Sequence, residues 1–406
     1  MILRIFPDEK LLMYQTLKNC YFHLRDIFFT IEFHFNERRK RNAAKKVVQI
    51  LANKKPKHKI LNKIAFYVYC RTHVDHLKPI YKHLDKNSFV IILPDDLDLK
   101  ESLIQEGYNV STSYEIILSE YKFRCLVSLY MQLPTWMLHY IKKDKISLNI
   151  HTFFSLFTSK NTRMVYSLGA LPWNKSNTML DYDEIFVCGP YEENIYNQKY
   201  NSEIEIKQVG YPKFDSFINN NDKTIRNNIE LDCSKKTILW LPTKDGLCSI
   251  DKYVNIISKL RDNYNVLLKP HPFEENARIK IAVSCGIEVV ESSDSAPFYQ
   301  IADFVFCDYG GSAFGALYMD KPILFLSPDN PYKDKHYSND SPELILRKKL
   351  LYIDDIKIDE LTNLLSDKSL WAKQKIIRKE LRSIFFTDNY GKSGEYAAKL
   401  LEDKLI

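Results

Sequence analysis

The sequence lacks any paired arrangement of cysteines. Its eight cysteines stand singly among 406 residues, and none forms a C-x-x-C pair. This spacing indicates neither a disulfide framework nor a zinc-binding cysteine cluster. Glycine is also scarce, at 11 residues beside 16 prolines. That composition excludes a long flexible linker and a glycine-rich low-complexity tail.

Long apolar runs are missing as well. The most apolar candidate, 125–140, is too short to cross a bilayer and contains Gln132, Pro134 and His139. Arg4 and Asp8 interrupt the apolar residues near the start, which is not typical of a signal peptide. We therefore expect a protein of the reducing cytoplasm.

What is present is an uneven distribution of charge. The net charge is +7, and residues 1–60 hold 14 lysines and arginines against 5 acids, so the rest of the chain is slightly acidic. The stretch 21–33 before the basic cluster is strongly aromatic. Aromatic and basic residues together favour contact with an anionic membrane surface, while a solvated helix packed on the protein explains the charge equally well. Nucleic-acid binding is not expected, because no recognised module accompanies the charge.

Short apolar runs alternate with helical segments through the rest of the chain. This alternation predicts βαβ units with parallel sheets. The pattern restarts near 237 after the polar patch 219–222. We predict an α/β protein with two doubly wound Rossmann-like domains facing a cleft, with boundaries at 61–218 and 219–406 and a basic helical region at 1–60. The predicted strands are 63–70, 89–93, 108–110, 123–129, 147–150, 184–188, 206–209, 237–241, 264–268, 304–307 and 323–326.

Two motifs of the second half follow predicted strands. Segment 308–312 contains two glycines and opens a helix, and segment 269–272 places a histidine between two prolines. Glycine lets a backbone approach a ligand closely, and free amides with a helix dipole favour phosphate. The two motifs predict chemistry on a phosphorylated or nucleotide-activated substrate.

These segments, with several others in order and spacing, resemble the CDP-glycerol glycerophosphotransferase family of teichoic-acid polymerases and primases. The similarity spans roughly 170 residues of the second half and is carried by 210–215, 241–243, 269–272, the motif at 308, 321–322, 328–329 and 389–393. The resemblance implies a GT-B type transferase that moves glycerol phosphate, or ribitol phosphate, from a CDP-linked donor to a hydroxyl of a lipid-linked or polymeric envelope or capsule glycan and releases CMP. It also implies peripheral association with the inner face of the cell membrane.

The resemblance further implies roles for particular residues. His151, expected at the end of strand 147–150, is the candidate base, although the glycine that follows this histidine in the family is absent here. His271 is the second candidate catalytic residue, acting on the pyrophosphate. The candidate donor-binding residues are Thr243, Lys244, Lys269, Pro272, Asp308, Gly310, Gly311, Ser312 and Asp329. Lys244 stands where the family often has arginine.

Arg71, His73 and His76 are candidate acceptor-binding residues in a polar turn after the first strand, although a solvated loop explains them as well. The two histidines have no third partner at zinc-like spacing, so we expect neither a metal nor a cofactor. Two alternatives stay open. One is a GT-B nucleotide-sugar glycosyltransferase or a sugar-nucleotide 2-epimerase, and the other is a non-catalytic scaffold of envelope assembly.

Overall fold

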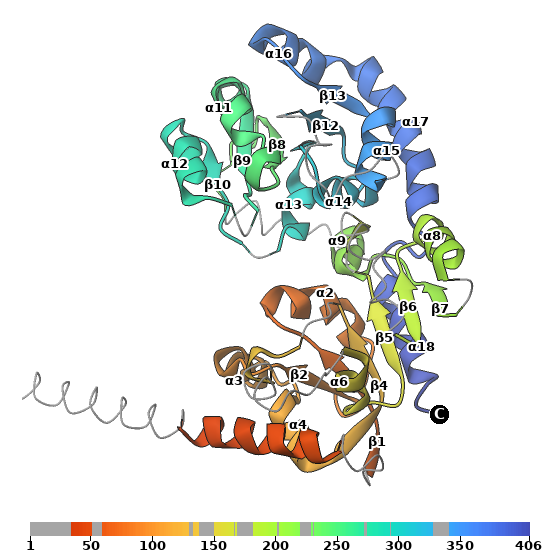
Figure 1. The fold of residues 1–406 in the computed structure, drawn as a ribbon. Helices are drawn as coiled ribbons and strands as arrows, with labels where there is room; N and C mark the ends of the chain where they lie inside the picture. Colours follow the sequence, from red (N-terminus) through yellow and green to blue (C-terminus); the bar gives the residue numbers. More distant parts are fainter. Residues whose placement is uncertain are drawn as a thin grey trace, which may run out of the picture.

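The computed structural model describes residues 34–50, 59–129, 133–137, 150–165, 167–168, 182–200, 203–219, 229, 231–271, 274–292, 294–327 and 341–406 (Figure 1). These residues form two lobes, each built on its own sheet. Within them, no helix combines the length and the apolar character that crossing a bilayer requires.

The first sheet has seven parallel strands in the order β3-β2-β1-β4-β5-β6-β7. Its strands are β1 (Lys59–Tyr67), β2 (Phe89–Leu93), β3 (Val110–Thr112), β4 (Tyr121–Ser128), β5 (Asn161–Met164), β6 (Glu184–Val187) and β7 (Glu205–Gln208). The central strands read as continuous apolar runs because helices cover both faces of the sheet. Those helices are α2 (Arg71–Tyr81), α3 (Leu97–Gln105), α4 (Ser113–Ser119), α6 (Ile150–Ser155) and α8 (Pro190–Tyr200).

The second sheet has six parallel strands in the order β10-β9-β8-β11-β12-β13. Its strands are β8 (Lys236–Leu241), β9 (Tyr264–Leu268), β10 (Glu288–Val289), β11 (Phe304–Cys307), β12 (Ile323–Leu326) and β13 (Leu351–Ile353). Its helices are α11 (Ile250–Ile257), α12 (Asn276–Ser284), α13 (Ala296–Ile301), α14 (Ser312–Tyr318), α15 (Pro342–Lys349), α16 (Ile358–Ser366) and α17 (Lys368–Phe385). In both sheets the chain winds outward on one side and then returns to the other, so the predicted doubly wound α/β fold is confirmed.

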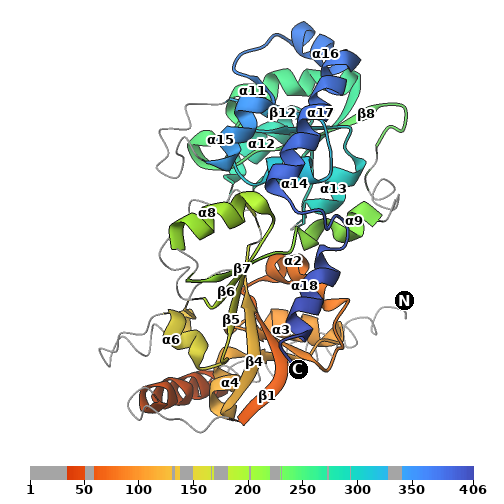
Figure 2. The same ribbon diagram turned by 90° about the vertical axis from the view of Figure 1, so that its right-hand side faces the viewer.

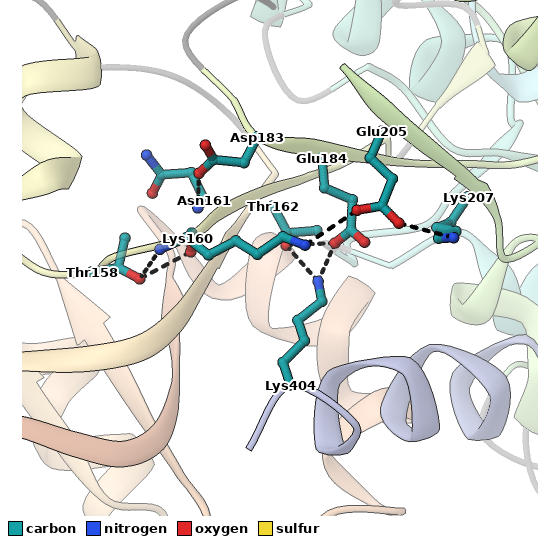
Figure 3. Close-up of polar contacts among 9 residues, drawn as sticks. All are labelled: Thr158, Lys160, Asn161, Thr162, Asp183, Glu184, Glu205, Lys207 and Lys404. Carbon is teal, nitrogen blue, oxygen red and sulfur yellow. Dashed lines mark hydrogen bonds and ion pairs between the residues drawn. The ribbon is translucent and has the colours of Figure 1, made fainter. Parts of the chain in front are cut away.

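The last helix, α18 (Ser393–Glu402), returns to the first lobe. Figure 2 shows α17 along the second lobe and α18 beside α2. Ala397, Ala398 and Leu401 are buried in the core around β1 and β2. Beyond the helix, the ammonium group of Lys404 donates to Oγ1 of Thr162 over 3.0 Å and pairs with the buried carboxylate of Glu184 (Figure 3). The chain therefore crosses between the lobes twice.

The basic N-terminal region is helical over 34–50, and this helix packs on the first lobe. Ala43, Ala44 and Val47 are buried in that lobe's core. Arg39 and Lys46 pair with Glu115 and Glu120 at 3.1 and 2.6 Å. The packed-helix interpretation therefore holds for this part, and the aromatic stretch 21–33 lies outside the described residues.

Of the predicted strand 147–150, residues 147–149 lie outside the described part of the chain, and Ile150 begins α6. Phe153, Phe154 and Phe157 follow at helical spacing and bury together against Tyr67. The strand beside β4 is β5, which the sequence did not reveal. The predicted polar turn at 71–76 is wrong, since α2 begins at Arg71, shortly after β1.

Candidate functional site

The second sheet changes its winding direction between β8 and β11, which are adjacent parallel strands. Open α/β sheets bind ligands in the crevice at the carboxyl ends of the two strands that flank such a switch. Here the loop that starts at Pro242 and segment 308–312 follow those two strands, and we call this end of the sheet the β8–β11 crevice. The structure thus brings together the candidate residues Thr243, Asp308, Gly310, Gly311 and Ser312.

Asp308 ties the two loops together. Its carboxylate accepts hydrogen bonds from the backbone amides of Thr243, at 2.6 Å, Tyr309, at 2.7 Å, and Ser249, at 2.9 Å. The side chain is buried, and burial raises the pKa of Asp308 to about 7 against the opposing effect of these amides. The carboxylate thus binds backbone amides of the protein itself, and these hydrogen bonds fix the shape of the crevice.

The glycine turn is shaped for close approach. Gly310 has a φ of +96°, a conformation that L side chains rarely adopt, and a Cβ built on it would lie 3.5 Å from Oγ1 of Thr243. A Cβ on Gly311 would collide with Oγ of Ser167, which follows β5 of the first lobe. Ser312 donates to the carbonyl oxygen of Leu241 over 3.4 Å and begins α14. The turn is therefore one of the places at which the lobes meet.

Lys269 and His271 follow β9, the other neighbour of β8. Lys269 is buried, and its pKa is lowered by burial and by the nearby Lys213, with Asp294 acting in the opposite direction. The carbonyl oxygen of His271 accepts from the amide of Glu274 over 2.9 Å, and its side chain is half-buried. Pro272 and Asp329 lie outside the described residues. Lys244 is exposed at the mouth of the first loop.

The three candidate acceptor-binding residues lie in the first turns of α2. The guanidinium of Arg71 pairs with Asp75, at 3.3 Å, and with Glu106. Nδ1 of His73 accepts from the amide of Tyr69 over 3.4 Å, and burial with the neighbouring Arg163 lowers the pKa of His73 to about 4.

His76 is buried, and its pKa is well below the ordinary value because of burial first and Lys213 second. Both imidazoles are accordingly neutral near pH 7. His151 lies in α6, not at a strand end, and the position of its side chain is outside the description.

Sequence reasoning missed two residues of the site. Ser167 follows an unrecognised strand. Arg347 lies under the crevice on α15, where it donates to the carbonyl oxygen of Asp308 over 3.1 Å and covers the Tyr309 ring at 4.5 Å. The run 347–349 is basic and resembles a solvated helix face, so the sequence held no signal that Arg347 is buried.

The two connections between the lobes run side by side. The amide of Tyr211 donates to Oγ of Ser393 over 3.1 Å, and the amide of Gly394 donates to Asp215 over 2.6 Å. Burial raises the pKa of Asp215 to about 6. Segments 210–215 and 389–393, which both carried the resemblance, form one junction together with Gly394.

The fold defines the class of protein. Two doubly wound α/β lobes with parallel sheets and a crossing C-terminal helix form a two-domain protein of the GT-B type. Residues 148–348 match the model of the family described as CDP-Glycerol:Poly(glycerophosphate) glycerophosphotransferase. The chain belongs to this family, as the sequence motifs predicted.

Two curated relatives come from Bacillus subtilis (strain 168). The teichoic acid glycerol-phosphate primase is 27% identical over 188 residues, which cover 44% of this chain and 49% of the relative. The teichoic acid poly(glycerol phosphate) polymerase is 24% identical over 171 residues, covering 38% of this chain and 23% of the relative. The chain thus matches about half the length of the first relative and less of the second.

Solved structures of the wall teichoic acid polymerase TagF share the fold. One superposes with a TM-score of 0.63 at 16% identity and covers 97% of this chain and 98% of the other. A variant of the same polymerase, soaked with CDPG, gives a TM-score of 0.61 at 16% identity, with coverages of 91% and 98%. At this identity the likeness establishes the architecture alone.

Proposed function

We propose that the protein transfers glycerol phosphate, or ribitol phosphate, from a CDP-activated donor to a hydroxyl of a lipid-linked or polymeric envelope glycan, with release of CMP. The observation that carries the proposal is the crevice between β8 and β11, where Thr243 and the turn 310–312 converge in a member of this family. A GT-B polymerase that has been soaked with CDPG supports the choice of donor.

The crevice suits a diphosphate. Amides of the turn can approach phosphate oxygens because Gly310 and Gly311 have no side chains in the way. Helix α14 has only seven residues, so we assign the binding to the turn and not to a helix dipole. Lys269 supplies a buried cation beside the crevice, and a buried charge interacts with phosphate more strongly than an exposed one does.

Transfer of the alcohol phosphate requires an acceptor oxygen to attack phosphorus while the bond to the CMP oxygen breaks. The protein's task is positioning and charge stabilisation. We assign His271 to the leaving phosphate, where an imidazole can donate a hydrogen bond or a proton. His151 remains the proposed base. Its helix is packed against Tyr67, the last residue of β1, which supports a place near the carboxyl ends of the strands.

The acceptor and the membrane belong to the same proposal. Arg71, His73 and His76 are the proposed acceptor-side residues, on the lobe opposite the crevice. The helix over 34–50 exposes Arg38, Arg41 and Lys45, which supports contact of the protein with the anionic inner surface of the membrane.

A second candidate function is a non-catalytic scaffold of envelope assembly. One observation favours it: among the described residues after β5, the one that lies against Gly311 is Ser167, and a serine is not a general base.

An assay of CMP release separates the candidates. With CDP-glycerol or CDP-ribitol and a lipid-linked acceptor, we expect CMP to form. We expect His271→Ala to lower the rate by about 10²-fold or more, while His83→Ala, an exposed histidine after α2, serves as the matched control. Release of a nucleoside diphosphate from UDP-sugars would indicate a sugar transferase. Absence of CMP with every donor and acceptor would favour the scaffold.

A further inference from the structure

A cavity of about 300 Å³ lies at the junction of the lobes, apart from the crevice. One wall is the end of α2 with its C-cap residue, which contribute Lys78, Pro79 and Lys82. The opposite wall is the connection after β7 together with the loop before α13, which contribute Lys213, Phe217 and Asp294. Both lobes therefore build this cavity.

The acids at the cavity already have partners. Asp294 pairs with Lys213 at 3.3 Å, and Asp75 pairs with Arg71 at 3.3 Å. Arg71 is shared with Glu106, so it neutralises Asp75 only in part, and Asp75 also attracts Lys78. The wall as a whole holds three lysines against these two aspartates.

Lys78 and Lys82 are the remaining lysines. They lie four residues apart, on one face at the end of α2. Neither ammonium group forms an ion pair with an acid among the described residues, although Asp75 and Glu106 attract Lys78, and Asp215 attracts Lys82. Lys269 adds a further buried cation near Lys213, as their mutual repulsion indicates. The cavity therefore carries an excess of positive charge with room for a small anion.

We propose that this cavity binds a phosphodiester group of the acceptor polymer, and that Lys78 and Lys82 are its principal ligands. The inference rests on the proposed function, since a growing glycerol-phosphate or ribitol-phosphate chain carries one such group in every unit. Pro79 and Phe217 provide an apolar wall for the carbon atoms between phosphates. Cations from both lobes then fix an acceptor chain beside the crevice that holds the donor.

The test measures binding by titration calorimetry of the full chain with three probes: a short synthetic glycerol-phosphate oligomer, inorganic phosphate and CDP-glycerol. We expect the oligomer to bind the wild type, and the double variant Lys78→Gln/Lys82→Gln to bind it about tenfold more weakly. The salt dependence of oligomer binding should also decrease in that variant. CDP-glycerol affinity should be unchanged.

The matched control is Lys375→Gln/Lys379→Gln, an exposed pair with the same spacing on α17, which should leave oligomer binding as in the wild type. Equal affinity of the Lys78/Lys82 variant and the wild type for the oligomer would overturn the proposal. So would oligomer binding no tighter than that of inorganic phosphate. If the protein binds CDP-glycerol but not the oligomer, the cavity proposal fails and the proposed function stands. If the protein binds the oligomer but no CDP-linked donor, the proposed function fails and the cavity proposal stands.

Discussion

At the scale of single residues, Asp308 sets the shape of the crevice. We predict that Asp308→Asn lowers the free energy of unfolding by about 1–3 kcal/mol, because the amide group that replaces one oxygen faces a backbone N–H and leaves it without an acceptor. The same change should weaken CDP-glycerol binding, since Thr243 and Tyr309 lose their anchor. Urea unfolding and calorimetry measure the two effects.

The control for Asp308 lies at the other end of the same strands. Asp303 accepts from the amide of Thr237 over 2.8 Å at the amino ends of β8 and β11. Asp303→Asn should cost stability without changing donor affinity. If both variants weaken CDP-glycerol binding equally, Asp308 affects the donor only through general stability and not through the shape of the crevice.

Glu343 predicts a dependence of stability on pH. Its carboxylate is buried in the first turn of α15, neither oxygen has a hydrogen-bond partner within the described residues, and burial raises its pKa to about 8. Because the folded pKa lies above the unfolded value, the stabilising contribution of this group is complete below the unfolded value of 4.5 and is lost as the pH rises toward 8.

We therefore predict that Glu343→Gln is more stable than the wild type at pH 8, by on the order of 2 kcal/mol, and that this advantage shrinks toward pH 5. Urea midpoints across this pH range measure it. Glu402→Gln, at an exposed carboxylate, is the control. A difference between Glu343→Gln and the wild type that is independent of pH would contradict the account.

At the scale of elements, the junction depends on the contact of α18 with α2. A Cβ on Gly394 would lie 2.6 Å from the carbonyl oxygen of Pro79, so the two helices could not keep their spacing. We predict that Gly394→Ala lowers the free energy of unfolding by about 1–3 kcal/mol. Hydrogen exchange should accelerate in α18 before it accelerates in β8. Unchanged exchange in α18 would show that the contact is not needed.

The helix over 34–50 has a buried face and a basic face, so deleting it would damage the core and the proposed membrane contact together. Substitution separates the two. Arg38→Gln/Lys45→Gln should reduce binding to anionic vesicles about tenfold or more, with the unfolding free energy unchanged. Lys375→Gln/Lys379→Gln is the control. Equal loss in both variants, or equal binding to neutral vesicles, would argue against contact through this face.

At the scale of the whole molecule, the apolar strand runs were sufficient to predict two parallel sheets, because buried strands covered on both faces leave a strong signal. Strand β5 (Asn161–Met164) gave no such signal, because it is polar although it is fully buried. Its Thr162 forms hydrogen bonds with Glu184 and Lys404, which are distant in the sequence. The amphipathic pattern of α18 could not by itself show which lobe the helix packs on.

The candidate site divides in the same way. The glycine turn and Lys269 were predictable because they follow apolar strands directly. The structural role of Asp308 and the burial of Arg347 were not, since both depend on contacts between loops and helices that local sequence does not encode. Of the strand predicted at 147–150 only Ile150 is described, and it begins α6, whose Phe153 and Phe154 look equally apolar in either periodicity.

The most direct test of the central claim is the electron density of a crystal soaked with CDP-glycerol. The account predicts a diphosphate between Thr243 and the turn 310–312, within hydrogen-bond distance of the amides of Gly310 and Gly311 and close to Lys269. Density for the nucleotide at another place on the protein, with the β8–β11 crevice empty, would contradict it.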